Sequence, residues 1–196
     1  QEHTRAYIKI QDGCNQFCTY CMIPYARGRV RSRQQADILE EIKGLADAGY
    51  KEFVLTGIHI SSYGAAALLE LLRAIDEIAG VERIRLGSLE PRIVTKEFAD
   101  SLARLKHICP HFHLSLQSGC ASVLKRMNRH YTPKEYLDGV ECLRAAFTHP
   151  AITTDVIVGF PGETDEEFAQ TVQFVKDADF YEMHIFKYSR RKGTKA

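Results

Sequence analysis

Short apolar segments alternate with amphipathic helical segments along the 196 residues of the chain. Consecutive parallel strands need a crossover between them, and helices supply it, so this alternation predicts a parallel sheet with helices packed outside. Apolar spacing of strand type predicts strands at 6–10, 52–56, 83–86, 111–116, 153–158 and 182–187. Apolar spacing of helical type predicts helices at 36–48, 66–79, 95–105, 122–127, 132–147 and 164–178.

This order of elements suits an open doubly wound sheet or a barrel. No helical segment follows the last expected strand, so we predict the α/β class with a parallel (βα)6 partial TIM barrel, as if the chain were a piece of a longer protein. Glycines and polar residues follow nearly every expected strand, at the edge where such folds place their functional sites. With 45% hydrophobic residues, the chain is long enough for one domain with a sizeable core.

The composition excludes some classes of protein. The 26 basic residues nearly cancel the 25 acidic ones, so net charge gives no indication of nucleic-acid binding. No apolar stretch approaches the roughly 20 residues of a membrane span, and no signal peptide opens the chain. Cys109, Cys120 and Cys142 are scattered without pair spacing, which argues against a disulfide framework and predicts a reducing cytoplasm.

The other three cysteines, Cys14, Cys18 and Cys21, lie close together after the first expected strand. A structural zinc ion takes four ligands, and a four-iron cluster takes one ligand per iron. Three thiolates therefore leave one metal coordination position open, where a small molecule could bind. The aromatic residues Phe17 and Tyr20 favour a shielded iron–sulfur cluster, but the chemistry of these ligands alone is also compatible with a zinc site.

The cysteine segment resembles the C-x3-C-x2-C signature of the radical S-adenosylmethionine (SAM) enzymes, with Tyr20 as the aromatic residue before the last cysteine. The run 11–33 resembles the methylthiotransferase branch, and most of all its bacterial members that act on threonylcarbamoyladenosine in tRNA. The similarity continues in order through segments 55–64, 86–91, 114–119, 126–131, 155–164 and 186–190.

The resemblance implies that Cys14, Cys18 and Cys21 hold a [4Fe-4S] cluster whose fourth iron binds SAM. An electron from a donor such as flavodoxin or ferredoxin would then cleave SAM to a deoxyadenosyl radical. That radical would abstract hydrogen from the tRNA adenosine and lead to its 2-methylthiolation. Full-length relatives also carry an amino-terminal domain with a second cluster and a carboxyl-terminal RNA-binding β-domain. We expect residues 1–196 to be the radical core domain without these two.

Candidate cofactor-binding residues lie where the expected strands end. Many relatives have an acidic residue after Thr56 and Gly57 that holds the methionine amino group, but this chain has Ile58 and His59 there. Glu90 is the candidate for the missing carboxylate; the alternative is a surface glutamate before a proline turn.

Ser115 and Gln117 alternate along the expected strand 111–116 and beyond, so both should face the barrel interior, where Gln117 could bind ribose hydroxyls. Arg129 could pair with the methionine carboxylate, or it could be an ordinary arginine at a helix end. The resemblance adds an adenine contact in the turn after the fifth strand. The full set of cofactor candidates is Tyr20, Thr56, Gly57, Glu90, Ser115, Gln117, Arg129, Gly159 and Phe160.

Two basic segments are candidates for substrate binding. Arg27, Arg29 and Arg31 alternate with other residues, and in an extended conformation they would project to one side and could grip the tRNA backbone. The alternative is a solvated or internally paired basic loop. Tyr188 and Arg190 form a second basic and aromatic group where a base could stack.

Two rival functions remain. Within the family, the substrate could be another tRNA adenosine or a ribosomal protein. In a different class, the chain could be a zinc-stapled RNA-binding module without catalysis. We expect the histidines beside the strands to be packed polar residues rather than further metal ligands: His59, His111, His113 and His184.

Overall fold

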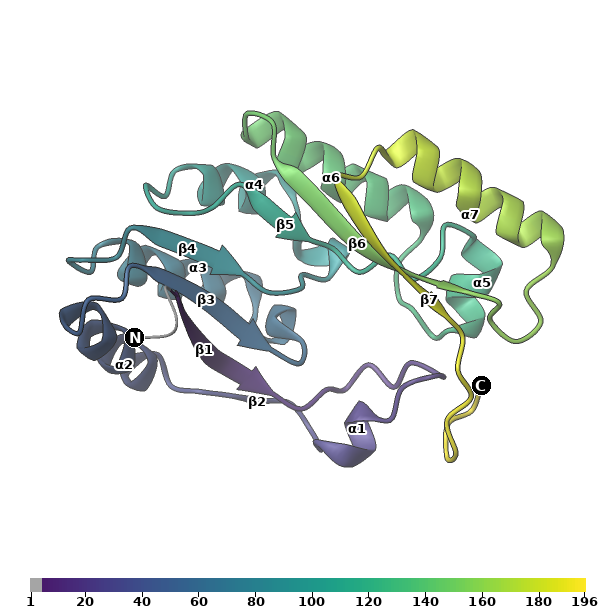
Figure 1. Cartoon of the computed structure of the whole chain (residues 1–196), viewed down its shortest axis with the longest axis horizontal. Helices are drawn as coiled ribbons and strands as arrows, with labels where there is room; N and C mark the ends of the chain where they lie inside the picture. Colours follow the sequence, from purple (N-terminus) through teal and green to yellow (C-terminus); the bar gives the residue numbers. More distant parts are fainter. Residues whose placement is uncertain (1–4) are drawn as a thin grey trace.

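The computed structural model describes residues 5–196, and in it strands and helices alternate as the sequence predicts. The strands form a curled sheet with the longer helices on its outer side (Figure 1). The strands are β1 (Arg5–Asp12), β2 (Arg31–Ser32), β3 (Glu52–Gly57), β4 (Arg83–Leu86), β5 (His111–His113), β6 (Ala151–Val158) and β7 (Glu182–Lys187).

The helices lie between the strands in the chain. Within the described residues, none is long and apolar enough to cross a membrane. They are α1 (Ile23–Ala26), α2 (Gln35–Asp47), α3 (Ala65–Asp76), α4 (Lys96–Ala103), α5 (Ala121–Arg126), α6 (Pro133–Ala146) and α7 (Asp165–Ala178), with two short 3-10 helices, η1 (Ile60–Tyr63) and η2 (Pro91–Ile93).

The strands belong to two ladders, β2-β1-β3-β4 and β5-β6-β7, in which every pair but the antiparallel β1–β2 pair is parallel. Between β4 and β5 the sheet is joined only by isolated bridges, Ile84 with Ile108 and Leu89 with Leu114. We call this junction the seam. The two ladders and the seam together give the six parallel strands expected of the partial barrel.

The core lies between the sheet and the outer helices. Ile8 and Phe53 on the first ladder are fully buried, as are Ile38 on α2 and Leu72 on α3. Each such side chain contributes roughly 1.5–3 kcal/mol when it is removed from water. The concave face of the sheet therefore remains for polar side chains, and it faces the segment before α1 (Figure 1).

The helix starts follow their sequence signals. Thr164 begins α7 with a capping box: its hydroxyl accepts from the Glu167 backbone N–H at 3.3 Å, and the Glu167 carboxylate accepts from the Thr164 N–H at 3.1 Å. Thr132 begins α6 in the same way. Such boxes fix where a helix starts, and hence where the preceding strand end points.

The structure differs from the sequence prediction at the fifth strand. The expected strand 111–116 ends at His113, because the Thr154 hydroxyl accepts the Leu116 N–H at 3.0 Å in place of a backbone carbonyl. Gln117 then has a φ of 68°. The predicted alternation of Ser115 and Gln117 along one strand is therefore wrong.

The turn at Gly13 has a backbone conformation and a close contact that only glycine tolerates, and this can be tested by substitution. Gly13 has a φ of +72°, and a Cβ there would lie 2.0 Å from the Arg29 carbonyl oxygen. We expect Gly13→Ala to lower the free energy of unfolding by about 2 kcal/mol or more, measured by urea denaturation. Gly44 in α2 has open space around it, so Gly44→Ala should instead raise that free energy by about 0.5–1 kcal/mol. Equal effects of the two changes would contradict this account.

Candidate metal centre and cofactor pocket

The cysteine segment follows the end of β1 and is held by hydrogen bonds to the residues just after α5. The side-chain amide of Asn128, just after α5, donates to the carbonyls of Gln16 at 3.0 Å and Phe17 at 3.1 Å. The Thr19 N–H donates to the Met127 carbonyl at 3.0 Å. Residues more than a hundred positions apart in the sequence thus fix the cysteine segment over the concave face.

All three cysteines line one pocket of about 140 Å³ at the carboxyl ends of the strands. Polar side chains from other strand ends share it, so the predicted site residues converge there. The cofactor candidates that line this pocket are Tyr20, Glu90, Ser115, Gln117 and Arg129.

Each cysteine sulfur accepts one N–H hydrogen bond. The backbone N–H of Gln16 points at Cys14 Sγ, that of Ile23 at Cys21 Sγ, and a guanidinium N–H at Cys18 Sγ, each at 3.4 Å. Such donors stabilise a thiolate. Burial raises the pKa of the Cys14 and Cys21 thiols, so a metal must displace their protons on binding.

The arrangement fits an iron–sulfur cluster better than a zinc ion. Tetrahedral zinc needs thiolate sulfurs roughly 3.8 Å apart, whereas each cysteine of a four-iron cluster binds a different iron. In residues 5–196, the three sulfurs do not form a set of ligand atoms all within 4.8 Å of one another; a different trio does. The nearest imidazole, His59, is engaged at both nitrogens, 3.1 Å from Glu90 Oε2 and 2.8 Å from Ser62 Oγ. Among the described residues that line this pocket, the imidazole of His59 and the carboxylate of Glu90 are both engaged with other side chains, so either would have to leave its partners to become a fourth zinc ligand.

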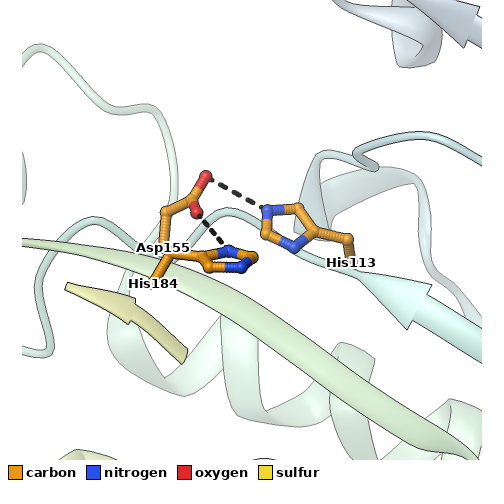
Figure 2. A group of neighbouring side chains, drawn as sticks. All are labelled: His113, Asp155 and His184. Atoms are coloured by element: carbon orange, nitrogen blue, oxygen red, sulfur yellow. Dashed lines mark hydrogen bonds and ion pairs between the residues drawn. The ribbon is translucent and has the colours of Figure 1, made fainter. Parts of the chain in front are cut away.

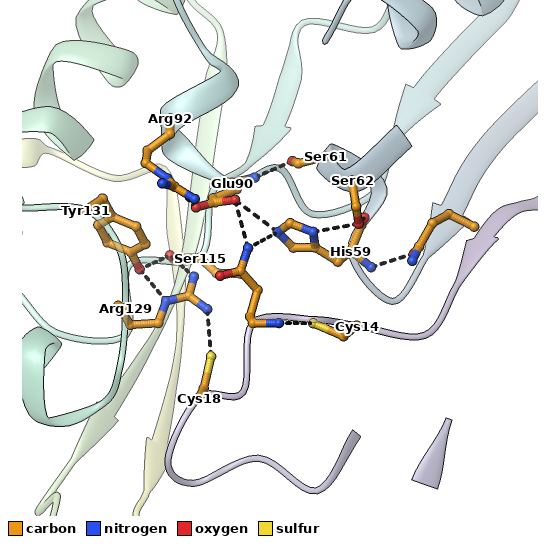
Figure 3. Close-up of polar contacts among 12 residues, drawn as sticks. Cys14, Cys18, His59, Ser61, Ser62, Glu90, Arg92, Ser115, Arg129 and Tyr131 are labelled. Carbon is orange, nitrogen blue, oxygen red and sulfur yellow. Dashed lines mark hydrogen bonds and ion pairs between the residues drawn. The ribbon is translucent and has the colours of Figure 1, made fainter. Parts of the chain in front are cut away.

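Glu90 is a buried carboxylate, with 7% of its surface exposed, rather than the surface glutamate of the alternative prediction. Its Oε1 accepts from Arg92 Nε at 2.7 Å, and its Oε2 accepts from Gln16 Nε2 at 3.3 Å (Figure 3). Burial alone would raise the pKa of Glu90, but the hydrogen bonds with His59 and Arg92 outweigh burial and lower that pKa to about 2. The pocket therefore contains a fixed negative charge at neutral pH.

Arg129 supplies the positive charge of the pocket (Figure 3). Its Nε donates to the Tyr131 hydroxyl at 3.0 Å, and its Cζ lies 5.0 Å from the centre of the Tyr131 ring. Its Nη2 donates to the Ser115 carbonyl at 3.4 Å. Burial alone would lower the pKa of Arg129, but the neighbouring tyrosines and Cys18 outweigh burial and raise it. Arg129 is thus a half-buried cation held by its neighbours and not an ordinary arginine at a helix end.

A second pocket of about 320 Å³ adjoins the first, and Tyr20 and Gln117 line both. The second pocket also has Asp155 from β6 and Tyr188 after β7 in its lining. The Tyr188 hydroxyl is buried and has no hydrogen-bond partner among the described residues. Gln117, Asp155 and Arg191 bring polar side chains to its lining, so this pocket favours a polar ligand.

Four of the cofactor candidates line neither pocket: Thr56, Gly57, Gly159 and Phe160. Phe160 packs behind the site, with its ring 6.3 Å from Tyr20 and 5.6 Å from Tyr188. The Gly159 N–H donates to the Glu163 carboxylate at 2.7 Å. Their cofactor roles stay predictions.

The basic segment is not one extended strand, because α1 ends at Ala26 and Gly28 turns with a φ of 75°. The Arg29 guanidinium lies 4.9 Å from the Phe17 ring centre. Arg31 donates to the carbonyls of Arg27 and Arg29 at 3.1 and 3.2 Å. The three side chains are exposed but do not form the one-sided row predicted for an extended run. Of the second group, Tyr188 lines the larger pocket and Arg190 does not.

Sequence reasoning missed Gln16, Tyr131 and Asp155, and took His59 only as a packed residue. The signal for Asp155 was present, since it is the one charged residue in the expected strand 153–158. Nothing in the sequence pattern pointed to Gln16 or Tyr131, because their contacts are made with residues of other elements.

Comparison with known proteins identifies a family and several relatives that are similar to this chain. A family model described as the radical SAM superfamily matches residues 8–175. The threonylcarbamoyladenosine tRNA methylthiotransferase MtaB of Chlamydia pneumoniae is 48% identical over 195 residues, covering 98% of this chain and 46% of that protein. The tRNA-2-methylthio-N(6)-dimethylallyladenosine synthase of Clostridium tetani is 44% identical over 198 residues, covering 98% of this chain and 44% of that protein.

Among solved structures, the radical S-adenosylmethionine methyltransferase TsrM of Kitasatospora setae matches with a TM-score of 0.78 at 22% identity, covering 93% of this chain and 36% of that one. The predicted α/β partial barrel is therefore confirmed. The chain spans about half the length of the curated relatives it matches. Because the family model covers most of the chain, including the three cysteines, this chain belongs to the radical SAM superfamily.

Proposed function

We propose that this chain is the radical-generating core of a tRNA methylthiotransferase. The observation that carries the proposal is the convergence of three unpaired cysteines with a buried carboxylate and a half-buried guanidinium on one pocket. Cys14, Cys18 and Cys21 would hold a [4Fe-4S] cluster. Because they supply three ligands for four irons, one iron stays open to the cofactor SAM.

The charges of the pocket match the methionine part of SAM. Its amino group is a cation that the Glu90 carboxylate could receive, and its carboxylate suits the forked guanidinium of Arg129. The Nη contacts of Arg129, at 3.4 Å, are long, so these two nitrogens could turn to a ligand while the Tyr131 hydroxyl retains Nε. Glu90 would thus take the place of the acidic residue that Ile58 and His59 replace.

Tyr20 and Gln117 lie where the two pockets meet, and we place the ribose of SAM beside them. Burial raises the pKa of the Tyr20 phenol, which therefore keeps its proton as a hydrogen-bond donor. Gln117 offers both a donor and an acceptor to ribose hydroxyls. When bound, the cluster supplies the electron that cleaves SAM to a deoxyadenosyl radical. The chain's own part is to hold SAM and to keep water away from it.

The larger pocket is where we place the substrate base, because Tyr20 and Tyr188 bring aromatic side chains to it. The relatives named above act on threonylcarbamoyladenosine and dimethylallyladenosine in tRNA, and we propose the threonylcarbamoyl nucleoside as substrate. Exposed Arg27, Arg29 and Arg31 would meet the tRNA backbone.

The whole protein would complete the reaction in the reducing cytoplasm, where all six cysteines remain free. We assign this chain, residues 1–196, the radical core alone. Insertion of sulfur through a second cluster, and binding of tRNA by a β-domain, would lie in other parts of the whole protein. Flavodoxin or ferredoxin would supply the electron.

Anaerobic reconstitution with iron and sulfide tests the core function. We expect a brown chromophore, and 5′-deoxyadenosine on addition of reductant and SAM, measured by chromatography. Cys14→Ala, Cys18→Ala and Cys21→Ala should each abolish both, because each removes the ligand of one iron. Cys142→Ala on α6 is the matched control and should retain both. One bound zinc with no chromophore and no 5′-deoxyadenosine would favour the zinc-stapled module and refute the radical function.

The substrate is tested separately with the whole protein that contains this chain. We expect it to methylthiolate tRNA carrying threonylcarbamoyladenosine, measured by mass spectrometry of the digested nucleosides. tRNA carrying dimethylallyladenosine and a ribosomal protein serve as competing substrates. If the protein modified either of these in preference to threonylcarbamoyladenosine, the proposed substrate would be rejected, but the proposed radical function would not be.

The charge of Glu90 predicts a pH dependence of stability. Its pKa of about 2 in the folded protein lies below the ordinary value of 4.5, so its stabilisation is complete above about pH 5 and is lost as the pH falls. Between about pH 6 and pH 3 this loss amounts to roughly 2 kcal/mol. The difference in unfolding free energy between the cluster-free wild type and Glu90→Gln should therefore shrink by that amount.

Urea denaturation at each pH measures this difference. Glu70→Gln, at an exposed position on α3, controls for the change from carboxylate to amide. A constant difference between wild type and Glu90→Gln across this range would show that the ionised Glu90 is not stabilised by its partners.

A further inference from the structure

A second group of ligand-type side chains lies on the concave face, apart from the cysteines. His113 comes from the end of β5, Asp155 from β6 and His184 from β7, so three neighbouring strands each contribute one (Figure 2). His113 Nε2 lies 3.1 Å from Asp155 Oδ2, and His184 Nδ1 lies 3.3 Å from Asp155 Oδ1. The carboxylate is thus held between two imidazoles.

The spacing of these atoms suits a metal ion. One ligand atom from each residue lies within 4.8 Å of the other two, and in residues 5–196 no other trio of such side chains meets this condition. Imidazole and carboxylate ligands about 2.0–2.1 Å from a tetrahedral ion are roughly 3.3 Å from each other. Each imidazole is already at about this distance from one of the two Asp155 oxygens, and all three ligand atoms lie within 4.8 Å of one another.

The second nitrogen of the His113 imidazole faces an oxygen that could orient the ring. His113 Nδ1 lies 3.0 Å from Thr153 Oγ1, so Nε2 is the nitrogen that can bind a metal ion. His184 Nε2 lies 4.0 Å from a Glu182 carboxylate oxygen, beyond hydrogen-bond distance, while its Nδ1 is the nitrogen directed at Asp155. Metal-binding histidines characteristically have such an oxygen partner on the other ring nitrogen.

The group is also reachable by an ion from solvent. The side chain of His184 is 54% exposed, that of Asp155 26% and that of His113 15%. Asp155 also lines the larger pocket, so open coordination positions would face that pocket. A purely structural His–Asp–His network explains the two short contacts, but it does not require a half-exposed His184.

We propose that His113, Asp155 and His184 bind one divalent first-row transition-metal ion, with an open position for water or an oxygen ligand. Two imidazoles and one carboxylate are the donor set that iron(II), cobalt(II) and zinc share. This proposal goes beyond the proposed function and does not depend on it. With this site filled, reconstituted protein would contain one metal ion in addition to the four irons of the cluster.

Titration of the full, cluster-free chain with Co²⁺ tests the site, because visible spectra distinguish thiolate from imidazole and carboxylate ligands. We expect two classes of bound ion, one with sulfur-to-metal charge transfer and one without. His184→Ala and Asp155→Asn should each weaken the second class by about 100-fold or more, since even the loss of a partner behind a ligand costs about 10–100-fold. Both variants should leave the thiolate class unchanged, and Cys18→Ala should do the reverse.

His107→Ala is the matched control. His107 Nδ1 also pairs with a carboxylate, Asp76 Oδ1 at 3.0 Å, but no second imidazole is among its contacts in the described residues. The backbone N–H groups of Lys106 and His107 keep donating to Asp76 at 2.9 Å after the change. Circular dichroism checks that each variant is folded, and His184→Asn replaces His184→Ala if that variant is not. Absence of a second class in the wild type, or its persistence in His184→Ala and Asp155→Asn, overturns the proposal.

Discussion

The site depends on the hydrogen bonds that Asn128 and Met127 make to the cysteine segment. Those bonds join a loop that follows the first strand to the end of a helix on the second ladder. Without them, nothing in the ladders would bring Cys18 to Arg129, because β1 and β5 are not neighbours in the sheet. The pocket is thus created by tertiary contacts across the concave face, and the strands only supply its floor.

The buried Glu90 and the half-buried Arg129 of the pocket are stabilised in different ways. Glu90 takes hydrogen bonds from three side chains, including one guanidinium. Arg129 donates one hydrogen bond to the Tyr131 hydroxyl at 3.0 Å, makes longer contacts through its outer nitrogens, and has no carboxylate partner among the described residues. Burying charge is costly unless it is paired, so the less satisfied partner is the one that gains most from a ligand. A ligand carboxylate would therefore improve the environment of Arg129 more than a ligand amine would improve that of Glu90.

The fold could be predicted from the sequence because it follows from the periodicity of apolar residues and from capping signals such as Thr164. The cysteine site could also be predicted, since its ligands are close in the chain. The network around Glu90 could not, because Gln16 and His59 reach it from two segments that are distant in the sequence. Gln117 shows a different limit: it faces the pocket as expected, but through a positive φ after the strand has ended and not through strand alternation.

The seam between β4 and β5 has a consequence for the shape of the sheet. Regular ladders twist gradually, but here only a few backbone bonds join the two ladders: Ile84 N–H to the His107 carbonyl, Cys109 N–H to the Ile84 carbonyl and Leu89 N–H to the His113 carbonyl. Helix packing, with α4 lying against α6, and the cysteine segment supply the remaining connections between the two ladders. Glu90 and Ser115 follow the strands on either side of the seam, so their positions in the pocket depend on side-chain packing more than on a continuous ladder of backbone bonds.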